Sequence, residues 1–476
     1  MLDLPGLGQP TTLSAQCQRR LDLPGSLARR RANSVTDLPL VNDLESNPLA
    51  FATSTVADAE LDSVSSSATW TQRLCQRLVL QSFEPMTRGR LTVRLPDGQT
   101  RIFGHGEAGP EAELHIRRFQ FFPRGVLHGD VGFGEAYQDG DWDSPDLFAL
   151  IGWFCANVEH APSMSGSQAR HWHLNLMSLW NRVRHRLNRN SLAGSRSNIQ
   201  AHYDLGNSFY SLWLDPTMTY SAALFEAPDQ SLAAAQSAKY DRLCRQLQLK
   251  PTDHLLEIGS GWGGFTEHAV TRYGCRVTTV TLSEEQARYC TDRFQRGGYA
   301  DRARVELRDY RQLTGQFDKI GSIEMLEAVG DEYLETYFAK IHSLLPRHGR
   351  FAAQFITCPD QRHAELRRGV DWIQKHIFPG SLLLSMNRVG EVVQRTGNLW
   401  LHDLHDLGLD YARTLREWRE RFNGQLEAVR QQGFDERFIR TWNYYLAYCE
   451  AAFAWRNISV VQATWARPGQ AVSPES

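Results

Sequence analysis

The sequence lacks long hydrophobic runs and carries no excess of charge of either sign. No stretch approaches the roughly 18 apolar residues that a membrane-spanning helix needs. Lys and Arg total 52 against 54 Asp and Glu, and the net charge of −2 gives no overall attraction to nucleic acid. The amino-terminal region holds no apolar core segment, so we expect no secretory signal.

Paired cysteines are also missing. The eight cysteines are scattered along the chain and form no CxxC motif. This pattern fits neither a zinc site nor a disulfide framework, and it suits a reducing compartment. We therefore predict a cytoplasmic protein without a bound metal.

The length of 476 residues suffices for two or three domains at roughly 100–200 residues each. Residues 1–67 mix Pro, Gly, Ser and Arg without periodicity, and we expect them to be disordered. Residues 68–162 are interpreted as a β-rich domain. Residues 91–95 alternate apolar and polar side chains, residues 132–137 belong to the same β-rich stretch, and a short helix is expected around residues 147–158.

Residues 163–198 are predicted to form a basic amphipathic linker helix. The surrounding residues 160–203 contain no Asp or Glu, and apolar residues recur three or four positions apart. The interleaved arginines are Arg170, Arg182, Arg184, Arg186, Arg189 and Arg196. Such a helix is typical of a segment that lies on an anionic membrane surface, and a connecting helix with solvated arginines explains it equally well.

From residue 199 to 467, short apolar segments alternate with helix-like segments. The strand candidates are residues 254–258, 276–281, 317–323 and 350–356. This alternation is typical of βαβ units and predicts an α/β domain with a mostly parallel, doubly wound sheet. Residues 468–476 are expected to be a tail.

A glycine-rich loop follows the first strand candidate. Glu257 precedes Gly259, Gly261 and Gly263, which recur at alternate positions. Glycines let the backbone turn sharply and approach a ligand at the carboxyl end of the sheet. Alone, the loop fits a dinucleotide site or a tight turn. The acid before the glycines, and the absence of a carboxylate at residues 280–283, favour the S-adenosylmethionine loop of class I methyltransferases.

Several sequence motifs occur along the chain in the same order as in one known protein family, which makes the resemblance specific. Residues 200–207, 214–221, 256–263, 280–286, 322–330 and 377–380 resemble motifs of the cyclopropane-fatty-acid synthase family, which includes the mycolic acid methyltransferases. The resemblance extends from about residue 199 to 466. The segment that ends in Asp139-Gly140-Asp141-Trp142 resembles the amino-terminal domain of the longer bacterial members. The implied fold is a class I methyltransferase preceded by a smaller β-rich α+β domain.

The resemblance implies S-adenosylmethionine as the methyl donor. The residues implied to contact it are Tyr220, Ser221, Glu257, Gly259, Gly261, Gly263, Thr281, Gln286, Asp309 and Tyr310. The first two would close over the methionine end, Thr281 and Gln286 would address the ribose and adenine, and the last two would flank the adenine. For Tyr220, Thr281 and Tyr310, packing at strand ends is the alternative role.

The implied chemistry places demands on the site. An isolated alkene is a poor nucleophile, so the sulfonium methyl group must be held in line with the π bond. Methyl transfer leaves a carbocation that water would quench, and aromatic faces tolerate such a charge. The aromatic candidates, none assigned a role individually, are Phe209, Tyr210, Trp213, Tyr220, Phe378, Tyr444 and Tyr445.

Closing a cyclopropane ring also requires a base. The family resemblance implies a bound bicarbonate ion, held here by Glu327, the backbone of Ile356 and Tyr411, with Gln354 where other members have His. Ala222 and Ala328 also replace residues of better-known members, which puts the product in doubt. Cys449 matches a cysteine once regarded as a nucleophile, although a buried structural role is the preferred interpretation.

We therefore predict an enzyme that methylates the double bond of unsaturated phospholipid acyl chains at the inner face of the membrane and forms a cyclopropane. A methyl- or methylene-branched product stays open, as does a homologue that binds lipid or S-adenosylmethionine with little turnover. A small-molecule C-methyltransferase is disfavoured, because a free small substrate needs neither the basic helix nor the β-rich domain. Homodimer formation is left open.

Overall fold

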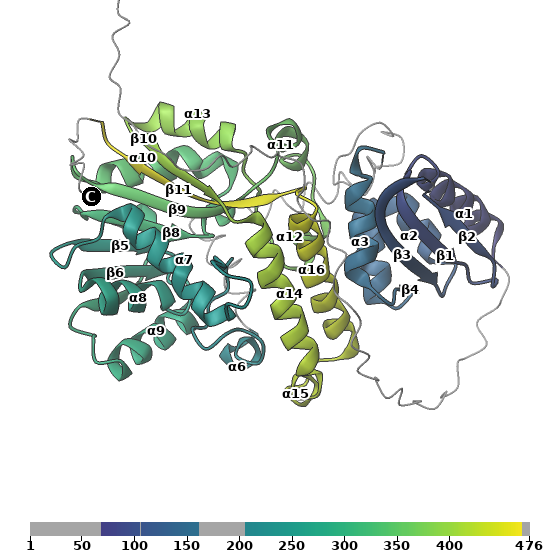
Figure 1. Ribbon diagram of the computed structural model, residues 1–476, viewed down its shortest axis with the longest axis horizontal. Coiled ribbons are helices and arrows are strands. Elements are labelled where there is room, and N and C mark those ends of the chain that lie inside the picture. The colour runs from purple at the N-terminus through teal and green to yellow at the C-terminus, as the bar shows by residue number, and fades with distance from the viewer. Residues whose placement is uncertain (1–67, 105, 161–204, 469–476) are drawn as a thin grey trace, which may run out of the picture. The chain divides into compact units, whose positions relative to one another are not determined.

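The computed structural model describes residues 68–104, 106–160 and 205–468 (Figure 1). The expectations for residues 1–67, for the basic helix within 163–198 and for residues 469–476 lie outside the described residues. The expected domain boundaries therefore stay predictions.

A four-stranded sheet with the order β2-β1-β3-β4 occupies the amino-terminal part of the described chain. Its strands are β1 (Arg88–Arg94), β2 (Thr100–Phe103), β3 (Glu107–Ile116) and β4 (Trp142–Asp143), and its helices are α1 (Trp70–Phe83), α2 (Phe121–Gln138) and α3 (Leu147–Ala156). In β1, buried Leu91 and Val93 alternate with residues that are more exposed, as in a strand with one covered face.

Residues 132–137, expected within the β-rich stretch, are helical instead. They belong to α2, which is kinked at Gly129, where φ is 56°. The glycines at 132 and 134 lower helix propensity, but tertiary packing overrides that preference. A Cβ on Gly134 would lie 2.4 Å from the Trp372 ring, so glycine allows α2 to approach that ring closely.

The second sheet has seven strands in the order β10-β11-β9-β8-β5-β6-β7. Four strands fall on predicted segments: β5 (His254–Ile258), β6 (Arg276–Thr281), β8 (Lys319–Ile323) and β9 (Arg350–Thr357). Three were not predicted: β7 (Ala303–Leu307), β10 (Trp400–Asp406) and β11 (Ser459–Ala466). Strands β5 to β9 pair in parallel, and β11 is antiparallel to both of its neighbours. The expected mostly parallel, doubly wound fold is confirmed.

Helices cover both faces of this sheet. Helices α7 (Leu232–Leu247), α8 (Gly264–Tyr273) and α9 (Glu284–Arg296) share one apolar cluster with Leu255 of β5. Helices α10 (Leu334–Leu344) and α13 (Met386–Thr396) share another with Leu256. Since successive side chains of a strand point to opposite faces, β5 is buried on both sides and its carboxyl end is fixed in the centre of the domain.

The remaining described α-helices are α6 (Asn207–Tyr210), α11 (Asp360–Leu366), α12 (Trp372–His376), α14 (Gly408–Gly424), α15 (Leu426–Gln431) and α16 (Glu436–Ala454). The long helices α14 and α16 lie side by side (Figure 1). None of the helices that the structure describes combines the length and apolar character needed to cross a bilayer.

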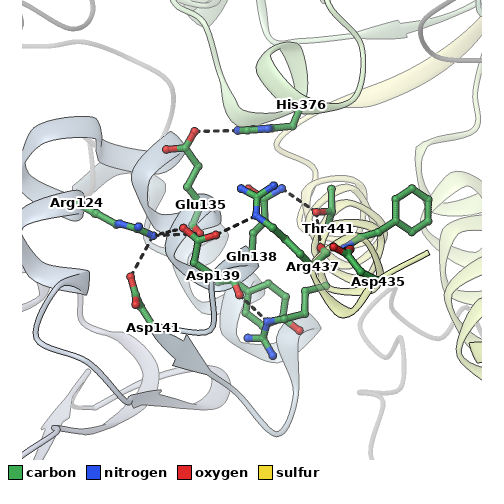
Figure 2. Close-up of polar contacts among 12 residues, drawn as sticks. Arg124, Glu135, Gln138, Asp139, Asp141, His376, Asp435, Arg437 and Thr441 are labelled. Atoms are coloured by element: carbon green, nitrogen blue, oxygen red, sulfur yellow. Dashed lines mark hydrogen bonds and ion pairs between the residues drawn. The ribbon is translucent and has the colours of Figure 1, made fainter. Parts of the chain in front are cut away.

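Polar side chains connect α2 to α12 and α16 within one compact unit (Figure 2). The pairs include Gln138 with Thr441 at 2.8 Å, Asp139 with Arg437 at 3.0 Å and Glu135 with His376 at 3.0 Å. Arg440 of α16 also donates to the carbonyl oxygen of Trp142 over 2.9 Å. Through these contacts the amino-terminal helices contribute to the wall of the site described next.

Candidate active site

A cavity of about 410 Å³ lies at the carboxyl ends of the central parallel strands, where doubly wound sheets bind their ligands. The loops that follow β5, β6, β7 and β8 all reach its wall. Of the site residues predicted from the sequence, all except Gly263 and Gln354 line this cavity. The structure therefore brings the expected set together around one space.

The three loop glycines all adopt left-handed backbone conformations, with φ of 93° at Gly259, 48° at Gly261 and 83° at Gly263. A Cβ on Gly261 would meet nothing within 4 Å, so this part of the backbone borders open cavity. A Cβ on Gly263 would lie 2.9 Å from the Phe294 ring. Gly261 thus leaves room for a ligand, whereas Gly263 allows the loop to pack on α9.

Glu257 lies at the end of β5 and is almost completely buried beside the loop. Its Oε2 accepts a hydrogen bond of 2.5 Å from Thr266 of α8. Burial raises the pKa of Glu257 to about 7, because the charged form loses its hydration. The carboxyl group is held rigidly at the cavity wall, where it can accept a hydrogen bond from a ligand.

Thr281 and Gln286, expected to address the ribose and adenine, are linked to each other. Thr281 Oγ1 donates to Gln286 Oε1 over 2.8 Å. Ser283 caps α9 by accepting a hydrogen bond from the Gln286 backbone nitrogen. Because α9 begins at this point, its first turn fixes the Gln286 side chain against the strand end.

Asp309 and Tyr310 follow β7 and lie at the cavity, as predicted, but Asp309 already has a partner. Its two carboxylate oxygens accept hydrogen bonds of 2.8 and 2.6 Å from the Arg311 guanidinium group. The Tyr310 ring contacts Tyr337, with 5.2 Å between the ring centroids. This ion pair was not predicted from the sequence.

A carboxylate that was not predicted, that of Glu324, occupies the cavity wall after β8. Its Oε1 accepts from the Ala222 backbone nitrogen and from Gln354 Nε2, each over 2.8 Å, and its Oε2 accepts from the Tyr411 hydroxyl over 2.9 Å. The backbone of Glu324 has φ of 49°, a conformation that costs a residue other than glycine on the order of 1–3 kcal/mol.

Glu327, expected from the resemblance to hold the bicarbonate ion, lies on the next turn of the same loop. Its Oε1 accepts a hydrogen bond from the Ile356 backbone nitrogen, and its Oε2 is buried without a hydrogen-bond partner among the described residues. Burial and the neighbouring Glu324 raise the pKa of Glu327 to about 8. The Ile356 nitrogen, expected to hold an external anion, is therefore bonded to Glu327.

A buried lysine lies behind this cluster. Lys239 of α7 is fully buried, and its Nζ donates to Ser221 Oγ over 2.6 Å and lies 4.3 Å from the centre of the Tyr240 ring. Burial lowers the pKa of Lys239 to about 7, although nearby carboxylates, Glu324 first among them, favour its charged form. Ser221, expected near the methionine end of the cofactor, is thereby hydrogen-bonded to a buried lysine.

Of the seven aromatic candidates, Tyr220, Phe378, Tyr444 and Tyr445 line the cavity. The hydroxyl groups of Tyr220 and Tyr445 lie 2.8 Å apart. The other candidates, Phe209, Tyr210 and Trp213, are completely buried in the core. The cavity therefore has an aromatic wall that suits a developing positive charge.

Cys449 also lines the cavity, but its environment does not favour a thiolate. Burial first, and the nearby Asp371 second, hold the pKa of Cys449 far above its usual range. A neutral thiol is a weak nucleophile. The structural role of Cys449 stays a prediction.

Glu324, Lys239 and Asp371 were not recognised from the sequence. Glu324 lies inside a motif that carries the family resemblance, and its position directly after a strand was a usable signal. Lys239 lies in α7, and the local sequence gave no such signal, because nothing local shows that a helical lysine is buried. Within the described part of the chain, no group of three or more His, Cys, Asp or Glu side chains is placed to hold a metal ion.

The parallel sheet, the glycine loop after its central strand and the polar residues at neighbouring strand ends define an S-adenosylmethionine-dependent methyltransferase of class I. Comparison with known proteins identifies the family. Residues 190–463, more than half of the chain, match the mycolic acid cyclopropane synthetases, and the chain belongs to that family.

Individual relatives agree with this assignment. The tuberculostearic acid methyltransferase UfaA1 of Mycobacterium tuberculosis is 38% identical over 373 residues, which cover 76% of this chain and 86% of the relative. The cyclopropane-fatty-acyl-phospholipid synthase of Escherichia coli K12 is 34% identical over 357 residues, with coverages of 75% and 88%. The structure of mycolic acid cyclopropane synthase CmaA1 complexed with SAH and CTAB matches with a TM-score of 0.53 at 32% identity, covering 57% of this chain and 97% of that one.

Proposed function

We propose that the protein transfers the methyl group of S-adenosylmethionine to the double bond of unsaturated fatty acyl chains in membrane phospholipids. The names of the relatives support a fatty acyl substrate: one is a tuberculostearic acid methyltransferase and another a cyclopropane-fatty-acyl-phospholipid synthase. The proposed cofactor contacts are those predicted from the sequence, with Gly261 and Thr281 at the donor and Tyr220 with Ser221 over its methionine end.

The continuity of the cavity is the observation that carries this proposal. One part of its wall is the glycine loop, and another part consists of apolar and aromatic side chains from α2, α3 and α16. These include Phe133, Ile151, Phe154, Tyr444 and Phe453. An acyl chain needs such a wall for most of its length, whereas a small polar substrate would leave it unused. The cavity thus favours a lipid over a small molecule.

The reaction begins when the π electrons of the alkene attack the sulfonium methyl group. A carbon–carbon bond forms, the sulfur–methyl bond breaks with its electron pair going to sulfur, and the neighbouring carbon becomes a cation. The aromatic wall around Tyr220 and Phe378 can stabilise that cation, and the apolar side chains of the cavity disfavour water beside it.

The product depends on how the cation is discharged. Loss of a proton from the new methyl group with ring closure gives a cyclopropane, the expected product. A hydride shift before that proton loss gives a methylene branch instead, and a saturated methyl branch would require a separate hydride donor. Either proton loss needs a base. The resemblance implies bicarbonate for that role, but Ile356 and Tyr411 already donate to the carboxylates of Glu327 and Glu324.

Access to phospholipid requires a surface that meets the membrane. Helix α1 exposes Trp70 at 76% of its surface and Leu74 and Leu78 at 46% each, at positions four apart on one helix face. Arg73 and Arg77 lie in the same helix, which has no acidic residue. Apolar and basic side chains together suit an anionic membrane surface.

Lipid mass spectrometry of bacterial cells that express the protein tests the proposal. We expect monounsaturated phospholipid acyl chains to gain the mass of one CH2 group, and proton NMR of the lipid to separate ring protons from methylene alkene protons. Cells that express the Gly261→Val variant serve as the control. If monounsaturated chains remain unmodified while the purified protein binds S-adenosylmethionine, the chain is a binding homologue and the proposal is wrong.

A further inference from the structure

We propose that the side chain of Glu324 is the base of this reaction and occupies the place that a bound bicarbonate ion would otherwise take. The inference rests on the proposed function and names the residue that completes it. It follows from the hydrogen bonds at the cavity wall, where a resident carboxylate fills an anion site.

The site around Glu324 is that of an anion. The backbone nitrogen of Ala222, the side-chain amide of Gln354 and the hydroxyl of Tyr411 converge on one carboxylate from three different elements of the chain. Gln354 is itself fixed, because its Oε1 accepts a 3.0 Å hydrogen bond from Gln462 of β11. Donors held in this way are preorganised for a negative charge and need no rearrangement to meet it.

An external bicarbonate ion does not fit the same residues. Tyr411 and Gln354, two of the groups implied to bind it, donate to Glu324, and the Ile356 nitrogen donates to Glu327. A second anion would also lie close to the charged carboxylate of Glu324, and like charges in a buried site repel strongly. The two glutamates therefore use the donors that bicarbonate would require.

The backbone at Glu324 supports a functional reason for the side chain. A glycine would adopt φ of 49° without steric cost, whereas a glutamate is strained there. The backbone nitrogen of Glu324 donates to the carbonyl oxygen of Gln354 over 2.7 Å, which holds the residue in this conformation and directs its side chain to the cavity. Strained residues at the wall of a reaction cavity are a recognised sign of function.

The charges around the pair assign different roles to the two glutamates. Glu324 has three hydrogen-bond donors and the buried Lys239 nearby, all of which favour its anionic form, although burial raises its pKa. Glu327 receives backbone hydrogen bonds only, and both burial and Glu324 raise its pKa. The hydrogen bonds thus place the negative charge of the pair on Glu324 and its proton on Glu327.

The proton transfer balances without any further reactant. A Glu324 carboxylate oxygen takes a proton from the newly added methyl group, and the electrons of that C–H bond form the last bond of the product. Glu324 becomes neutral and is restored when it releases the proton to solvent. Its hydrogen bonds also reduce the availability of the oxygen lone pairs, which opposes alkylation of the carboxylate by the cation.

The test compares two variants of Glu324 in buffer freed of carbon dioxide. Glu324→Ala should lower kcat by about 10²–10⁴, the usual scale for loss of a general base. It leaves the three donors around a vacated anion site, so added sodium bicarbonate or formate should restore a measurable part of the activity. Glu324→Gln should be equally slow but resist rescue, because the amide fills the site. The wild-type rate should not depend on bicarbonate.

Binding measurements keep the test decisive if a variant is inactive for other reasons. S-adenosylmethionine binding by calorimetry should be unchanged in both variants, and labelled bicarbonate should bind to Glu324→Ala but not to the wild type by carbon NMR. Glu420→Gln, an exposed charge change on α14, is the matched control. Wild-type methylation that stops without bicarbonate, or full activity of Glu324→Gln, would overturn the inference while leaving the proposed function intact. Absence of methylated lipid from the wild type would instead reject the proposed function.

Discussion

Gly261 and Gly263 share a left-handed backbone but differ in what a side chain would meet. A Cβ on Gly261 would point into open cavity, and one on Gly263 would lie 2.9 Å from Phe294. Both substitutions to alanine carry the same backbone penalty, on the order of 1–2 kcal/mol. A comparison of the two variants therefore distinguishes loss of ligand contact from loss of packing.

We therefore expect Gly261→Ala to weaken S-adenosylmethionine binding more than Gly263→Ala does, and Gly263→Ala to lower the free energy of unfolding more. Calorimetric titration and urea unfolding measure the two effects. Equal loss of binding with equal loss of stability in both variants would contradict the assignment of Gly261 to the ligand surface.

Lys239 does not line the cavity, and we assign it a positioning role next to Glu324. A single substitution tests this role. Lys239→Met removes a buried cation whose charge favours ionisation of Glu324. The pKa of Glu324 should therefore rise, and the acidic limb of the kcat profile should move to higher pH. The exposed Lys250→Met is the control. A lower rate with an unshifted pH profile would show that Lys239 only supports the fold.

The role of Glu324 illustrates why the site was only partly predictable. Most of the site residues predicted from the sequence line the cavity. Many of them lie at or just after the ends of parallel strands, which meet at one edge of the sheet. Hydrogen bonds among them depend on residues about a hundred positions apart, as between Ala222 and Glu324. Local sequence also gives no sign that a glutamate adopts a positive φ.

At the scale of elements, the best predicted strands are those buried on both faces. Strands β5 and β6 matched their predicted limits, because apolar and β-branched residues are bounded there by polar and glycine-rich turns. Strand β10 was missed, since most of its residues are exposed and it lies at the edge of the sheet. Its strand conformation comes from pairing with β11, which local sequence does not show.

Helix α1 supplies the prediction at this scale. Replacing Trp70 and Leu74 by glutamine removes apolar surface that is already exposed, so the fold should be retained while binding to vesicles of anionic phospholipid falls. Replacing Arg73 and Arg77 by glutamine should weaken binding mainly at low salt, because salt screens surface charge. Sedimentation with vesicles measures both. If neither pair changes binding at any salt concentration, the membrane contacts another surface.

Across the whole molecule, buried carboxyl groups link stability to pH. Burial raises the pKa of Glu327 and of Asp130 to about 8, and that of Glu257 to about 7. In the unfolded chain these groups ionise near their ordinary values of about 4. Between about pH 4 and 8 the folded protein thus binds more protons than the unfolded chain, so these groups make stability fall as pH rises.

Histidines with lowered pKa and Lys239 act in the opposite direction over parts of this range, so the contribution of one carboxyl group is best isolated by a variant. Glu327→Gln resembles the protonated acid but cannot ionise. Its free energy of unfolding should stay close to that of the wild type at pH 5, and should exceed it increasingly as pH rises toward 8. Urea unfolding at several pH values measures this difference, with Glu420→Gln as the control. A difference that does not depend on pH would show that Glu327 is already ionised at pH 5, and Glu324 could not then be the only charged member of the pair.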